Sequence, residues 1–83
     1  MGAPEILARL TAIFQEVFDD SALAIDVATT AEDVAGWDSV THVLLVVAVE
    51  QAFAVKFKTA EIETLKNVGD LVRLIDRKTA RKI

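Results

Sequence analysis

The two serines of this chain each follow an aspartate, in the pairs Asp20-Ser21 and Asp38-Ser39. The surrounding pattern predicts that Ser21 follows the end of a helix, whereas Ser39 begins one. A helix N-terminus presents unpaired backbone N–H groups and a partial positive charge, and therefore favours an anion attached there. A covalently attached anionic group would be better placed on Ser39 than on Ser21. Taken alone, however, an Asp-Ser pair at a helix start is more often a simple N-cap.

His42 lies three residues after Ser39, so the two side chains share one face of the expected helix. Together with Asp38, they supply the residue types of a hydrolase triad. Triads usually draw their members from separate elements and rely on an oxyanion-binding loop, and the sequence contains no Gly-rich loop that could form one. A hydrolase is therefore the weakest function considered, and we expect no catalytic residue. We expect His42 to be an exposed polar residue near the helix start.

Composition narrows the classes of site and partner. The absence of cysteine and the single histidine exclude thiolate and His-rich metal sites, and we expect no bound metal. Residues 1–50 carry a net charge of −8 and residues 51–83 carry +4, a balance that disfavours nucleic acid as a partner. The longest apolar run, Val43 to Val49, is too short to span a membrane, and no secretory signal is visible. These features predict a cytoplasmic protein.

The length and the spacing of apolar residues predict one all-helical domain over residues 1–83. The first helix should end near Asp19-Asp20, where the helical spacing of apolar residues stops. Its apolar residues are Ile6, Leu7, Leu10, Ile13, Phe14, Val17 and Phe18. A long ordered loop follows over residues 21–37, with one short turn expected at 31–35. Long loops of this kind are often functional.

Three further helices are expected after this loop. The second covers residue 38 to about residue 53 or 54, which is too long for a strand. A brief helix over residues 60–65 is capped by Thr59, and the last helix is capped by Asn67. The last helix carries an apolar stripe made of Val68, Leu71, Val72 and Ile75. Its basic end complements the helix dipole, with Arg77, Lys78, Arg81 and Lys82. The expected fold is a small bundle of three main helices plus one short helix.

Residues 36–53, GWDSVTHVLLVVAVEQAF, resemble the prosthetic-group region of acyl carrier proteins. In that family the serine of an Asp-Ser-Leu motif, here Asp-Ser-Val, carries 4′-phosphopantetheine. An apolar second helix follows and closes with a Glu…Phe pair, matched here by Glu50 and Phe53. The likeness in element order extends over essentially the whole chain. It implies a carrier rather than an enzyme, in which 4′-phosphopantetheine from coenzyme A is attached to Ser39 and holds acyl groups as thioesters.

The resemblance implies two sets of residues around the attachment point. The residues expected near the cofactor are Trp37, Asp38, Ser39, Val40, Ile62 and Leu65. The residues expected to contact partners are Val40, Val43, Leu44, Val47 and Glu50. The partners are a phosphopantetheinyl transferase and the enzymes that load and transfer acyl groups, acting on a monomeric carrier. Because the second helix is apolar nearly all round, some of its side chains must stay exposed.

The second helix also departs from the family's usual pattern. Fatty-acid carriers typically have a second helix rich in Asp and Glu, whereas here only Glu50 is acidic among those positions. The others are Thr41, Leu44, Gln51 and Ala52. This difference favours a specialised lipid, polyketide or related pathway whose partners dock through apolar contacts. Two alternatives stay open: an aminoacyl or peptidyl carrier of the same fold, and an unmodified helical adaptor that binds a protein through the second helix.

Overall fold

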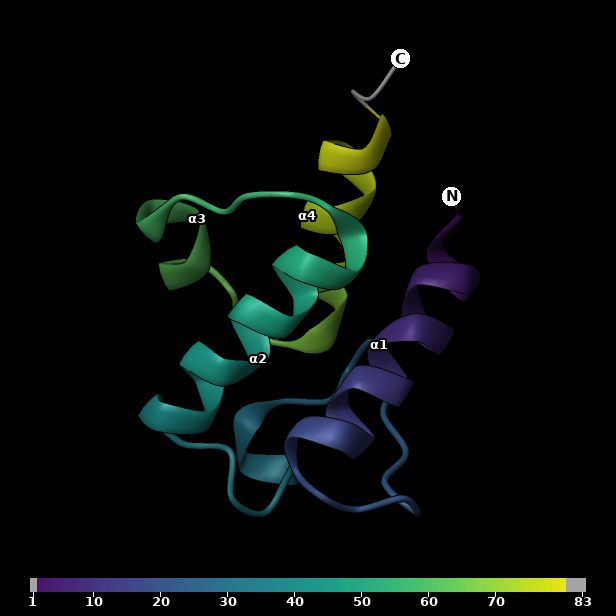
Figure 1. The fold of residues 1–83 in the computed structure, drawn as a ribbon, viewed down its shortest axis with the longest axis vertical. Coiled ribbons are helices and arrows are strands. Elements are labelled where there is room, and N and C mark those ends of the chain that lie inside the picture. The colour runs from purple at the N-terminus through teal and green to yellow at the C-terminus, as the bar shows by residue number, and fades with distance from the viewer. Residues whose placement is uncertain (1, 81–83) are drawn as a thin grey trace.

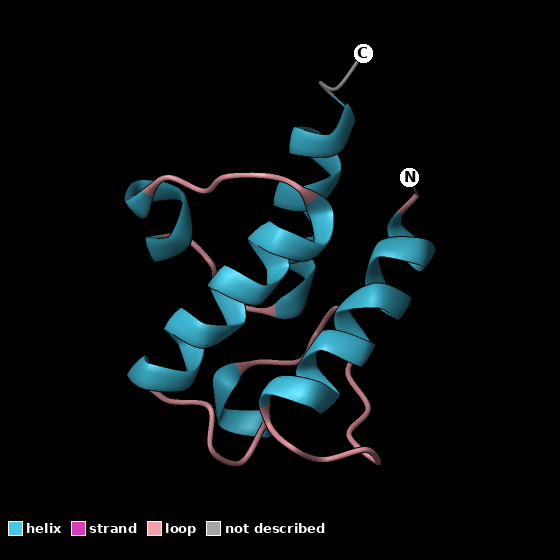
Figure 2. Cartoon of the chain, in the orientation of Figure 1, coloured by secondary structure: helices cyan, strands magenta, loops and turns pink. Residues whose placement is uncertain are grey.

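The computed structural model describes residues 2–80, which contain helices, turns and loops and no strand. The elements in chain order are α1 (Ala3–Val17), the 3₁₀ turn η1 (Ala31–Asp33), α2 (Ser39–Phe53), α3 (Thr59–Glu63) and α4 (Val68–Ala80). Helix α1 packs against both α2 and α4, and the long loop closes one end of the bundle (Figure 1). The expected all-helical bundle of three main helices and one short helix is confirmed (Figure 2).

Helix α1 supplies one wall of the core. Pro4 lies in its first turn, where the missing N–H of proline leaves no hydrogen bond unmade. The apolar stripe faces inward as predicted, and its fully buried members are Ile6, Leu10 and Phe14. The other members pack against the core while partly exposed: Leu7, Ile13, Val17 and Phe18. Asp19 has a left-handed backbone with φ 50°, which ends the helix at the predicted place.

The loop between α1 and α2 is fastened to the start of α4. The N–H of Val68 donates to the carbonyl of Thr29 at 2.8 Å, and the N–H of Gly69 donates to the carbonyl of Val27 at 2.9 Å. These bonds satisfy two donors that a helix start otherwise leaves unpaired. A Cβ at position 69 would lie 2.9 Å from the Val27 carbonyl oxygen, so this close approach requires glycine. The predicted short turn within the loop is η1.

Helix α2 begins at the predicted N-cap, Asp38, and ends at Phe53, before Ala54 with its left-handed φ of 54°. The helix is apolar on most of its circumference, but its buried and exposed faces are distinct. Its buried residues are Leu45, Val46, Val49 and Phe53. Its exposed large apolar residues are Val40, Val43, Leu44 and Val47. The prediction that part of this apolar helix stays exposed is therefore confirmed.

Helix α3 differs from the prediction at both ends. Its N-cap is Lys58, whose N–H donates to Oε1 of Glu61 at 2.8 Å. The prediction that Thr59 caps this helix was wrong. The helix begins one residue earlier than predicted, at Thr59 itself, and the Glu61 carboxylate in its first turn accepts the backbone N–H of Lys58. The helix ends at Glu63, so Leu65 lies in the link to α4 rather than on the helix.

A contact from α4 holds α3 against the bundle. The Lys78 ammonium lies 2.9 Å from Oε1 of Glu61, and both side chains are mostly buried. The same ammonium lies 5.9 Å from the ring centroid of Phe57, in the segment before α3. The hydrogen bond from the Lys58 N–H, followed by the contact with Lys78, holds the pKa of the Glu61 carboxyl below its usual range.

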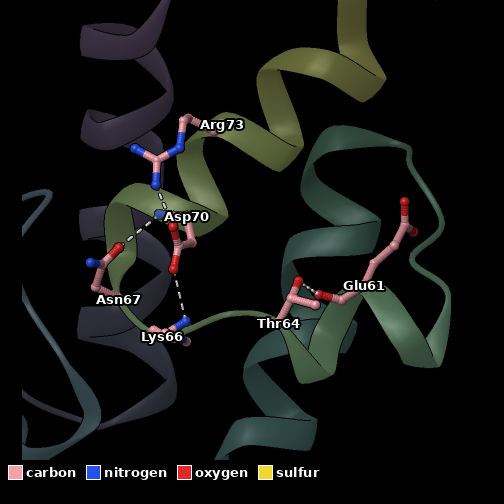
Figure 3. Close-up of polar contacts among 6 residues, drawn as sticks. All are labelled: Glu61, Thr64, Lys66, Asn67, Asp70 and Arg73. Atoms are coloured by element: carbon pink, nitrogen blue, oxygen red, sulfur yellow. Dashed lines mark hydrogen bonds and ion pairs between the residues drawn. The ribbon is translucent and has the colours of Figure 1, made fainter.

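Helix α4 begins at its predicted cap, since Oδ1 of Asn67 accepts the N–H of Asp70 at 2.9 Å. Asp70 in turn accepts the N–H of Lys66 at 3.0 Å and pairs with Arg73 (Figure 3). The hydrogen bond from Lys66, and then the contact with Arg73, hold the pKa of Asp70 below its usual range. The predicted stripe is buried throughout, with Val68, Leu71, Val72 and Ile75.

The basic end of α4 is described in part. Arg77 and Lys78 lie in its last turn, where positive charge complements the helix dipole. Arg81 and Lys82, which belong to the same prediction, lie outside the described residues. Over residues 2–80, no helix combines the length and the apolar character needed to cross a bilayer.

Candidate functional site

Ser39 is the first residue of α2, and its side chain is exposed to solvent. It also borders an open cavity of about 410 Å³ between α2, the end of the long loop and the segment that joins α3 to α4. A cavity of this size is in the range that binds small organic groups. The apolar residues along it are Leu45, Val46, Val49, Leu65 and Leu71, and the remaining lining residues are Ala31, Trp37, Asp38, Ser39, His42, Lys66 and Asn67. The Ser39 hydroxyl therefore lies where solvent meets an apolar interior.

The carboxylate of Asp38 is committed to the first turn of α2. Its Oδ1 accepts the N–H groups of Val40 and Thr41, each at 3.0 Å. These bonds, with the Thr41 N–H contributing most, hold the pKa of Asp38 below its usual range. Asp38 is thus charged at neutral pH and acts as a cap, not as a catalytic base. The expectation of unpaired N–H groups beside Ser39 needs correction, since two of them already have a partner.

The side chain of Thr41 closes the same cap. Its Oγ1 accepts the Asp38 N–H at 2.7 Å and donates to the carbonyl of Gly36 at 2.8 Å. A hydroxyl with both bonds made within the chain is not available to a ligand. The position that is often acidic in fatty-acid carriers is here used to shape the start of the helix.

His42 makes a contact that the sequence reading missed. The indole Nε1–H of Trp37 donates to Nδ1 of His42 at 3.1 Å, and the two ring planes are nearly parallel, with centroids 6.0 Å apart, so the rings meet edge to edge. His42 is half-buried, whereas we expected an exposed residue. No regular helical spacing relates position 37 to position 42, because the chain changes direction between them at the N-cap. Sequence periodicity therefore holds no signal for this pair.

Trp37 is itself anchored in the core by aromatic contacts. Its ring meets the buried Phe14 edge to face at a centroid distance of 5.2 Å, and it lies 6.1 Å from Phe18. Gly36, with φ 86°, allows the turn that directs the indole inward. The backbone N–H of Trp37 also donates to the carbonyl of Val34 at 3.2 Å. The indole thus connects the hydrophobic core to the rim of the cavity.

The structure brings together part of the predicted cofactor set. Trp37, Asp38, Ser39 and Leu65 all line the cavity. Val40, the most exposed of the large apolar side chains, and Ile62 are not among the residues that line it. Val40 follows Ser39 directly, and its neighbour in space is solvent rather than the cavity, because consecutive helix positions point in different directions.

The predicted partner-contacting set is divided in the same way. Four of its members form one exposed apolar surface along α2, which we call the α2 outer face: Val40, Val43, Leu44 and Val47. Glu50 has a different role, because its Oε2 accepts the N–H of Phe57 at 2.8 Å and so fixes the segment between α2 and α3. No local sequence pattern predicts this bond, which joins residues seven apart across the helix end.

Ser21 provides an internal comparison for Ser39. It is exposed in the turn after α1, where Oδ1 of Asp20 accepts the N–H of Ala22 at 3.0 Å. It does not line the cavity beside Ser39, and it follows a helix C-terminus, whose dipole disfavours an attached anion. Among residues 2–80, moreover, no group of His, Asp and Glu side chains is arranged to hold a metal ion.

Comparisons with known proteins bear on this site directly. A family model described as "Phosphopantetheine attachment site" matches residues 8–75. Among solved structures, the solution NMR structure of a holo acyl carrier protein from Geobacter metallireducens matches with a TM-score of 0.87 and 45% sequence identity. The match covers 93% of this chain and 88% of that one. No sequence among curated proteins matches the chain.

Proposed function

The chain belongs to the phosphopantetheine-attachment family of acyl carrier proteins, and we propose that Ser39 is the residue that carries its covalently attached 4′-phosphopantetheine. The observation that carries the proposal is the position of the Ser39 hydroxyl, exposed on the first turn of α2 and bordering the apolar cavity. Ser21, the other serine, also follows an aspartate, but it neither begins a helix nor lines the cavity.

The residues around Ser39 fit such a group. An exposed hydroxyl is accessible to a modifying enzyme, and the start of α2 places the positive end of a helix dipole beside an attached phosphodiester. The rim of the cavity is polar, with His42, Lys66 and Asn67, and its interior is apolar. A polar arm and an apolar cargo are therefore each matched by a part of the site.

The prosthetic group, when bound, supplies the thiol that forms thioesters with acyl groups. The chain itself contains no cysteine, so it offers no thiol that could compete for the acyl group. The side chains of Leu45, Val49 and Leu71 present apolar surface that excludes water from the interior of the cavity. The contribution of the protein is thus to hold and shield the cargo, while the chemistry is performed by separate enzymes.

The α2 outer face supports a specialised set of partner enzymes. Its four side chains are between 45% and 70% exposed, which is unusual for large apolar residues grouped on one helix. No acidic residue lies in the first turn of α2, and the carboxylate of Glu50 bonds within the chain. Docking on this face depends on apolar contact, so its affinity should change little with salt concentration. This supports a role in a lipid, polyketide or related pathway other than general fatty-acid synthesis.

The attachment site is tested by modification in vitro. The chain is incubated with coenzyme A and a permissive phosphopantetheinyl transferase, and its intact mass is measured. We expect one phosphopantetheine to be added to the wild type and to Ser21→Ala, and none to Ser39→Ala. Circular dichroism of both variants checks that they fold. Addition to Ser39→Ala, or no addition to the wild type with any transferase, contradicts the proposal.

The exposed apolar face also favours a second candidate function, an unmodified adaptor that binds another protein through α2. The two functions separate in cells that depend on this protein. A carrier loses activity with Ser39→Ala, whereas an adaptor keeps activity with Ser39→Ala and loses it with Val47→Asp. Because Val47 is 45% exposed, Val47→Asp should leave the fold intact.

A further inference from the structure

The bond between Trp37 and His42 determines where the imidazole carries its proton. Nδ1 of His42 accepts the indole N–H at 3.1 Å, so this nitrogen has no hydrogen of its own in the neutral ring. The proton of the neutral imidazole is therefore on Nε2. Within residues 2–80, no hydrogen bond is made by Nε2, so the His42 side chain keeps one donor that is not used within the chain. His42 lines that cavity together with Ser39.

The start of α2 has few other donors to offer an anion attached to Ser39. The N–H groups of Val40 and Thr41 both donate to Asp38, and the Thr41 hydroxyl is used within the cap. The Asp38 carboxylate also places a negative charge close to Ser39. Any protein donor to an anionic phosphodiester at this position would therefore come mainly from side chains, and His42 is on the same helix face three residues later.

The aromatic contacts of Trp37 make this arrangement rigid. The indole is fixed against Phe14 and Phe18, and the imidazole is hydrogen-bonded to its edge, with the two ring planes at an angle of 20°. The ring of His42 thus has its rotation limited by a hydrogen bond to an indole that is itself fixed. A donor whose orientation is fixed in advance loses less conformational entropy when it binds.

We infer that His42 positions the phosphodiester of the prosthetic arm by donating a hydrogen bond from Nε2–H, while Trp37 fixes the tautomer and orientation of the imidazole. The inference rests on the proposed attachment to Ser39. In this arrangement His42 is a positioning residue: it restrains the first part of the arm beside the cavity and takes no part in any bond that is made or broken. The ligand it recognises is a phosphodiester oxygen on the adjacent serine.

Two substitutions test the roles of the two His42 nitrogens separately. His42→Asn places an amide near the position of Nδ1, so it keeps an acceptor for Trp37 and lacks the distal donor. His42→Gln extends its amide to the position of Nε2, so it keeps the distal donor and lacks the acceptor for Trp37. Gln51→Asn, at an exposed position of the same helix, is the matched control. Each protein is converted to its holo form, and the intact mass confirms the arm.

Two NMR signals report the two contacts. The ³¹P shift of the phosphodiester is compared with its value in the same protein unfolded in guanidinium chloride, and the indole Nε1–H signal of Trp37, the only tryptophan, reports the bond to position 42. We expect His42→Asn to keep the indole signal and to lower the docked population of the arm about fivefold, the loss of one hydrogen bond. We expect His42→Gln to shift the indole signal and to keep the ³¹P displacement, and Gln51→Asn to change neither.

The possible results distinguish this inference from the proposed function. If the wild type acquires no arm, the proposed function fails and the inference fails with it. If the arm is attached to Ser39 but its ³¹P shift equals the unfolded value, or is unchanged in His42→Asn, the inference alone is overturned. The inference is also overturned if the ³¹P displacement and the indole signal of Trp37 change equally in both His42 variants, because His42 would then act only as a structural residue.

Discussion

Gly69→Ala tests whether the long loop is fastened to α4 as described, and thus whether the element that carries Trp37 has a fixed position. Alanine is the better helix former by about 1 kcal/mol, so helix propensity alone predicts that the substitution stabilises the protein. The structure predicts the opposite. A Cβ at this position would lie 2.9 Å from the carbonyl oxygen of Val27 and 3.3 Å from its Cβ. The first contact is with backbone and cannot be relieved by rotating a side chain.

The size of the effect follows from the two hydrogen bonds at this junction. The added methyl group must push the loop away, which lengthens the bonds to Val27 and Thr29, now 2.9 and 2.8 Å. Each bond contributes about 0.5–1.5 kcal/mol to the free energy of unfolding. Loss of both bonds would cost about 1–3 kcal/mol, and subtracting the gain in helix propensity of about 1 kcal/mol leaves a net destabilisation of up to about 2 kcal/mol. For a chain of this size, the full change of about 2 kcal/mol corresponds to a melting temperature lower by about 8–16 °C.

The measurement is thermal and urea unfolding followed by circular dichroism, combined with amide hydrogen exchange at residues 68 and 69. Arg73→Gly and Arg73→Ala form the control pair, because Arg73 is exposed on the same helix and both variants lose its contact with Asp70 equally. Their difference measures the Gly-to-Ala effect in α4 without a loop nearby. If Gly69→Ala raises the free energy of unfolding by as much as the Arg73→Ala and Arg73→Gly variants differ, then the loop does not approach position 69 as closely as described.

Two further predictions concern the contacts of Glu61. Lys78→Met keeps the apolar stem near Phe57 but removes the ion pair, so we expect exchange protection in α3 to fall while protection in α1 is unchanged. Equal loss of protection in both helices would show that α3 is not held separately. The lowered pKa values of Asp38, Glu61 and Asp70 predict acid sensitivity. Because each carboxyl has a lower pKa folded than unfolded, its stabilising effect is complete above the unfolded pKa of about 4 and is lost as the pH falls through the folded pKa. Urea unfolding between pH 7 and pH 3 should show this loss, and it should be smaller in Glu61→Gln; the same loss in that variant would contradict the role of Glu61.

The sequence was sufficient where one element determines its own structure. The helical spacing of Ile6, Leu10 and Phe14 identified α1 and its buried face, and Asp38 and Asn67 identified the starts of α2 and α4. Each of these signals depends on residues within one turn or one repeat, so it can be read along the chain.

The sequence was insufficient where distant segments meet. The bonds from the Phe57 N–H to Glu50 and from the Trp37 indole to His42 cross the ends of α2, and neither follows a helical or strand period. Gly69 offered a weak signal, because a glycine inside a helical pattern often marks a close approach, but only the structure identifies Val27 as the neighbour. Leu65 reaches the cavity from a link rather than from α3, which no local pattern indicates.

Under the proposed function, the two faces of α2 would let such a small chain both shield a cargo and present it. Residues of the inner face, such as Leu45 and Val49, line the cavity, while Val43 and Val47 on the α2 outer face are exposed. Ser39 lies at the helix start, where both faces are within reach of a flexible arm. A substitution on the outer face should therefore impair recognition by enzymes without changing how the cargo is held, and a substitution on the inner face should do the reverse. The two proposed functions would together account for the apolar excess of this helix, since a helix with a core function alone would have a polar outer face.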